Sequence, residues 1–154
     1  MKKLYFLLVF TVLNMSVFAQ TVMVRPSMAI GYYTSDGQRG LSYNYGGKVL
    51  LMANNFQRYG ILINHLTLPG DRSYLSTGIY LEQVLFGHFN MGIGTVGYIS
   101  LGDLDNTFGL YTHLGFEKPF ARRFHFLITY QSEMIFSRRV AINSSLMFGA
   151  GVLF

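Results

Sequence analysis

The fold of this 154-residue chain is decided by residues 142–154, which read INSSLMFGAGVLF. The even positions are mostly large and apolar: Ile142, Ser144, Leu146, Phe148, Ala150, Val152 and Phe154. The odd positions are mostly small or polar: Asn143, Ser145, Met147, Gly149, Gly151 and Leu153. Successive side chains of a strand point to opposite faces, so a period of two predicts a β-strand with one apolar face.

The same alternation extends back along the chain. Turn-forming clusters divide the sequence after residue 20 into eight runs, near 21–34, 40–53, 57–68, 73–86, 90–101, 107–117, 123–136 and 141–154. The links are short, at 35–39, 54–56, 69–72, 87–89, 102–106, 118–122 and 137–140, so neighbouring runs should pair as antiparallel hairpins. We therefore predict an all-β fold, an eight-stranded antiparallel up-and-down transmembrane β-barrel, with a soluble barrel as the alternative.

The first 19 residues have the pattern of a secretory signal peptide. Lys2 and Lys3 precede an apolar stretch at 4–13, and small residues at Val17 and Ala19 mark a cleavage site before Gln20. We expect a signal peptide at 1–19 and a barrel domain at 20–154. Removing the two lysines lowers the formal net charge from +5 to +3, too weak and scattered for a nucleic-acid surface. The chain has no cysteine, which excludes disulfides and cysteine-based zinc sites.

The distribution of charge favours a lipid-embedded barrel over a soluble one. With the apolar face outward, the inward positions include all six charged side chains of the strand interiors: Arg25, Lys48, Arg58, Glu82, Glu117 and Glu133. The middle of the opposite face carries no charge. A barrel in lipid has a polar interior and an apolar outer band, the reverse of a soluble lipocalin-like barrel.

The three basic and three acidic inward residues, with His125, predict an ionic network in the lumen. Pairing through the 69–72 link places Arg58 opposite Glu82, and pairing through the 118–122 link places Glu117 opposite His125. With both termini in the periplasm, these pairs lie toward the periplasmic end. An eight-stranded barrel is just filled by its side chains, so we expect a structural plug rather than a gated channel or a proton path.

Strand number, alternation and the end of the chain resemble the small eight-stranded outer-membrane barrels of the OmpA transmembrane-domain and OmpX type. The closing residues Phe148, Val152 and Phe154 are similar to the signal by which the barrel-assembly machinery recognises its clients, although Ala150 is smaller than the usual residue. The resemblance implies a monomer in the outer membrane of a Gram-negative envelope. Its partners would be lipid and lipopolysaccharide and, transiently, the assembly machinery, with no cofactor.

Some barrels that this chain resembles are lipid A deacylases or acyltransferases, with His, Ser and an acidic residue on the outward face near the outer rim. The nearest candidates are His65 and Thr67, but threonine stands where serine is expected and no outward strand carboxylate is present. His113 and His125 alone make a poor metal site. We therefore expect a structural or envelope-associated protein that is not an enzyme. The alternatives are a lipid A-modifying enzyme and a soluble periplasmic binding barrel. Measuring lipid A acylation with and without His65→Ala would test the first, and cell fractionation would test the second.

Overall fold

The computed structural model describes residues 21–154 except 36, 103 and 138. The expected signal peptide at 1–19 lies outside the described residues. Within the described part of the chain, no helix is long and apolar enough to cross a membrane.

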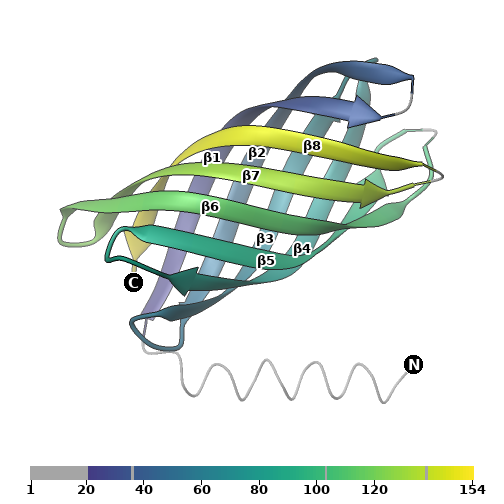
Figure 1. Ribbon diagram of the computed structural model, residues 1–154. Helices are drawn as coiled ribbons and strands as arrows, with labels where there is room; N and C mark the ends of the chain where they lie inside the picture. Colours follow the sequence, from purple (N-terminus) through teal and green to yellow (C-terminus); the bar gives the residue numbers. More distant parts are fainter. Residues whose placement is uncertain (1–20, 36, 103, 138) are drawn as a thin grey trace, which may run out of the picture.

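Figure 1 shows one antiparallel sheet that closes on itself as a barrel. The strands are β1 (Thr21–Ser35), β2 (Gln38–Met52), β3 (Gln57–Leu68), β4 (Arg72–Val84), β5 (Phe89–Ser100), β6 (Thr107–Ala121), β7 (Phe124–Phe136) and β8 (Val140–Leu153). Each strand pairs with the next along the chain, and β1 pairs with β8 to close the sheet. The predicted eight-stranded up-and-down barrel is thereby confirmed as a fold.

The predicted strand ends agree with the structure to within two residues, except at the end of β6. We predicted a link at 118–122, but β6 continues to Ala121 and only 122–123 form the turn. Pro119 is compatible with this longer strand. Because Glu117 N–H donates toward β5, to the carbonyl of His88, the backbone nitrogen of Pro119 faces the same side, where the β5–β6 ladder has already ended at Phe89 and Phe116.

The barrel has its apolar side chains outside and its charges inside. Ile142, Leu146 and Phe148 are 44–46% exposed, whereas Asn143 and Ser145 on the other face of β8 are buried. Every strand presents a large apolar side chain outward, for example Ile30, Tyr43, Ile61, Ile79, Ile93, Leu110, Phe126 and Leu146. The six charged side chains of the strand interiors are at most 7% exposed: Arg25, Lys48, Arg58, Glu82, Glu117 and Glu133. The predicted orientation of the faces is confirmed.

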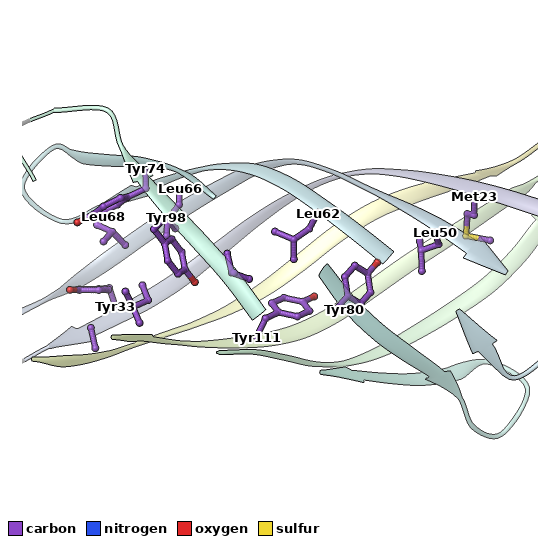
Figure 2. Packing of buried hydrophobic residues seen from close by; sticks show 13 residues of the cluster. Met23, Tyr33, Leu50, Leu62, Leu66, Leu68, Tyr74, Tyr80, Tyr98 and Tyr111 are labelled. Atoms are coloured by element: carbon purple, nitrogen blue, oxygen red, sulfur yellow. The ribbon is translucent and has the colours of Figure 1, made fainter. Parts of the chain in front are cut away.

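The interior is filled along its length, and Figure 2 shows the apolar part of this filling. Tyr33, Tyr74 and Tyr98 gather at one end, where the Tyr74 and Tyr98 rings meet edge to face at 6.1 Å. Met23 and Leu50 lie toward the other end, at which the described chain begins and ends. β3 adds the inward-facing Leu62, Leu66 and Leu68 to the same cluster. Arg25 Nε donates to Met23 Sδ at 3.0 Å, so buried charge begins directly beside the apolar side chains at this end.

Candidate functional site

The barrel interior holds a cluster of four charged side chains, which we call the ion-pair ring: Arg25, Arg58, Glu82 and Glu117. They come from β1, β3, β4 and β6, each from the part of its strand nearest the chain termini. Alternation turns all four inward, and they are 0–7% exposed. Four strands that are distant in sequence therefore place two cations and two anions in one buried volume.

Each arginine of the ring contacts both carboxylates. Arg25 donates from Nη1 to Glu82 Oε2 at 2.7 Å and from Nη2 to Glu82 Oε1 at 3.1 Å, and it also pairs with Glu117. Arg58 Nη1 donates to Glu82 Oε1 at 2.9 Å and to Glu117 Oε2 at 2.5 Å. The two positive and two negative charges of the ring cancel. Its guanidinium–carboxylate hydrogen bonds are charge-assisted, and the Arg25–Glu82 contact is bidentate, which makes them strong. Such pairing is what allows charges to remain ionised away from water.

Two histidines flank the ring. His113 Nε2 lies 3.2 Å from Glu82 Oε2, and His125 Nδ1 lies 2.7 Å from Glu117 Oε1. From the sequence we considered His113 as a possible metal ligand and did not assign it to the network. Its link to Glu82 crosses from β6 to β4, so no hairpin register could have indicated it.

The two predicted cross-strand pairings have different outcomes. Arg58 stands directly opposite Glu82 in the β3–β4 ladder, as predicted. The prediction that Glu117 stands opposite His125 is wrong by two residues, because the ladder pairs Glu117 with Leu127 and Pro119 with His125. The register differs because β6 runs on to Ala121 before it turns. The His125 and Glu117 side chains still meet, along the diagonal of the ladder.

Lys48 and Glu133 lie in a second polar layer with uncharged partners. Lys48 Nζ donates to the Tyr111 hydroxyl at 2.6 Å and lies 5.0 Å from the centre of that ring. Glu133 Oε2 accepts from the Asn143 amide at 3.3 Å, and Asn143 accepts from Ser42 Oγ at 2.6 Å. The structure therefore divides the seven residues of the predicted lumen network between the ion-pair ring with His125 and this second layer.

Glycines on β3 and β5 make room for interior rings that adjacent strands carry. A Cβ atom at Gly92 would overlap the His113 ring, and one at Gly60 would overlap the Tyr80 ring. Each of these glycines stands beside its ring's strand: Gly92 pairs with His113 in the β5–β6 ladder, and Gly60 pairs with Tyr80 in the β3–β4 ladder. The missing side chains are thus part of how the interior is packed.

We expect Gly92→Ala to destabilise the barrel by about 1–3 kcal/mol, because the added methyl group must displace His113 from Glu82. The free energy of unfolding, from urea titration in phospholipid vesicles, measures the effect. Gly97→Ala on the same strand is the matched control, because its Cβ would meet only the Thr77 carbonyl oxygen at 3.7 Å. Equal stabilities for the two variants would contradict the tight fit at Gly92.

His65 and Thr67 lie on the outward face of β3. Thr67 Oγ1 is 3.4 Å from His65 Nδ1, and the His65 ring stacks on Tyr45 with centroids 4.7 Å apart. The three glutamates of the strands all point into the interior, so within the described strands no carboxylate lies beside His65 on that face. Nor do the described residues contain a group of three or more His, Cys, Asp or Glu side chains that could hold a metal ion.

The sequence matches no protein-family model and no curated protein. Solved structures do share the fold. Neisserial surface protein A superposes with a TM-score of 0.66 at 12% identity, over 85% of this chain and 96% of that one. The N-terminal β-barrel domain of Pseudomonas aeruginosa OprF gives 0.65 at 10% identity, over 87% and 97%. Ail of Yersinia pestis gives 0.59 at 14% identity, over 87% and 98%. The fold is that of the small eight-stranded outer-membrane barrels.

Proposed function

We propose that this chain is an integral outer-membrane β-barrel protein with a side-chain-plugged lumen, a structural or envelope-associated role and no enzymatic activity. The observation that carries the proposal is the reversed distribution of polarity. Ile79 and Ile93 are 63% and 60% exposed at the middle of their strands, while Glu82 and Glu133 are fully buried. In water this arrangement would expose apolar surface around the whole barrel, whereas in lipid it is the stable one.

The outer surface supports a membrane position in a second way. Aromatic side chains are exposed at both ends of the barrel, as in the girdles that flank the apolar band of membrane barrels. At the end with the chain termini the exposed rings are Phe56, Phe86, Phe89, Phe120, Phe124 and Phe154. Tyr32, Tyr43 and Phe108 are exposed toward the other end. Aliphatic residues such as Ile61 and Ile79 fill the band between them.

The contents of the lumen support a plug. Side chains fill three successive levels of the narrow barrel: the ion-pair ring, the second polar layer with Lys48, and the tyrosines around Tyr98 at the far end. An eight-stranded barrel is narrow enough for side chains to fill it. Breaking a buried ring of paired charges to open a path would leave uncompensated charge in the interior.

The environment of His65 favours a non-catalytic role. A hydroxyl nucleophile needs a base that a third group orients, and that base must lie within hydrogen-bond reach. Thr67 lies 3.4 Å from His65, whose ring is stacked on Tyr45. We propose that His65 contacts lipid headgroups, including those of lipopolysaccharide, as an interfacial polar side chain. The barrel-assembly machinery would recognise the outward row that includes Phe148, Val152 and Phe154.

We expect the full chain, expressed in a Gram-negative host, to sediment with the outer membrane and to resist extraction by urea. Its electrophoretic mobility should change between unheated and boiled samples, because a closed barrel resists detergent until it is heated. Immunoblotting of separated envelope fractions measures both properties. Recovery of the folded protein from the soluble periplasmic fraction would contradict the proposal and favour a soluble binding barrel.

A further inference from the structure

The net positive charge of the chain after residue 20 is concentrated in one hairpin. Ten basic and seven acidic residues follow residue 20. Three of each face the barrel interior and cancel there. By sequence position, four of each lie in or beside the links at the end remote from the termini: Asp36, Asp71, Asp103, Asp105, Arg39, Arg72, Arg138 and Arg139. The three that remain are Lys118, Arg122 and Arg123, all in the hairpin formed by β6 and β7.

This hairpin extends beyond its neighbour. The β5–β6 ladder ends at Phe89 and Phe116, but the β6–β7 ladder continues to Ala121 and Phe124. In Figure 1 the hairpin reaches out at the end of the barrel where β1 begins and β8 finishes. The Arg123 carbonyl accepts from Leu153 N–H at 2.9 Å, which fastens the hairpin tip to the end of β8.

The exposed surface of the hairpin combines cations with aromatic rings. All side chains from 118 to 124 are exposed, and Phe120 is 67% exposed. The Phe120 and Phe124 rings lie 5.9 Å apart, on either side of the two arginines in sequence. Unlike the buried arginines, the three cations of the hairpin have no ion-pair partner among the described residues.

We propose that this basic hairpin binds the headgroups of anionic phospholipids in the leaflet at the chain-terminus end of the barrel. The inference rests on the proposed membrane position. Aromatic rings are favoured at the depth of the membrane interface, and cations beside them reach the phosphate groups. Guanidinium groups suit this ligand because they can donate two hydrogen bonds to one phosphate. The links at the opposite end carry equal numbers of positive and negative residues. We therefore expect attraction to anionic headgroups only in the leaflet at the chain-terminus end.

The test compares two double variants in vesicles of two compositions. The barrel and each variant are folded from urea into vesicles of phosphatidylcholine alone, or of phosphatidylcholine mixed with phosphatidylglycerol. Arg122→Gln with Arg123→Gln removes two positive charges from the hairpin. Arg39→Gln with Asp71→Asn removes one charge of each sign from the opposite end and leaves the charge of that end balanced. The readout is the increase in the folding equilibrium constant on adding phosphatidylglycerol. Each cation near an anionic surface contributes about a fivefold factor, so the hairpin variant should lose about 25-fold of that increase.

We expect the control variant to keep the increase, and high salt to diminish it in the unmodified barrel. An increase retained by the hairpin variant, or lost equally by both variants, would overturn the proposal. Failure of the unmodified barrel to fold into either kind of vesicle would instead contradict the membrane function, so the two failures are distinguishable.

Discussion

Replacing Glu82 with Ala is expected to lower the free energy of unfolding by about 3–5 kcal/mol. Glu82 is fully buried and accepts from Arg25 and Arg58, and it also lies beside His113. Without it, two buried guanidinium groups would share the single carboxylate of Glu117. The loss is large because the remaining cation is uncompensated in the interior, rather than because the pairs themselves contribute that much stability.

The measurement is urea unfolding of the barrel in phosphatidylcholine vesicles. Glu133→Ala is the matched control, because Glu133 is also fully buried but accepts from the Asn143 amide rather than from an arginine. Its removal should destabilise the barrel less than Glu82→Ala. A double-mutant cycle with Arg58→Ala isolates the Arg58–Glu82 coupling, because the second substitution removes one of the stranded cations. A change near zero for Glu82→Ala would show that the ion-pair ring does not hold in the membrane.

The part of the ring that could be predicted from the sequence is the part that depends on a single hairpin. Arg58 and Glu82 lie on the two strands of one hairpin, joined by a short link in which Gly70 and Asp71 adopt positive φ. β3 and β4 pair without a bulge along the whole distance from this link to the two residues. Counting outward from the turn was enough to place the two residues opposite each other. A lipid solvent also makes the alternation unusually clear, since the middle of the outward face must be free of charge.

The remaining contacts depend on how the closed sheet is staggered. Arg25 on β1 meets Glu82 on β4 across the lumen, and no local pattern encodes the shear that brings these strands face to face. The β6–β7 register was missed for a different reason. Pro119 and the two arginines after it predicted a turn. A proline is nevertheless acceptable in this part of β6, because the ladder to its neighbour β5 has already ended.

Placing a charge on the outer band gives the second large effect that we expect. Ile79 is 63% exposed, lies near the middle of β4 and pairs with Ile61 and Thr95 on the adjacent strands. Ile79→Arg should lower the free energy of unfolding in phospholipid vesicles by about 2–4 kcal/mol, the range for arginine on the lipid face at the bilayer midplane. On the surface of a soluble barrel the same substitution would change stability by no more than about 0.5 kcal/mol.

Leu75→Arg provides the matched control for depth. Leu75 lies on the same strand and the same face, four residues nearer the 69–71 link, and it is 36% exposed. Near the interface an arginine can extend its guanidinium to the headgroups, so its effect should fall to about 0–1 kcal/mol. A larger effect at position 79 than at position 75 is a depth profile that only a lipid solvent produces, because water surrounds both positions equally in a soluble barrel. Equal effects at the two positions would place the apolar band outside the bilayer and remove the physical basis for the reversed polarity of the barrel.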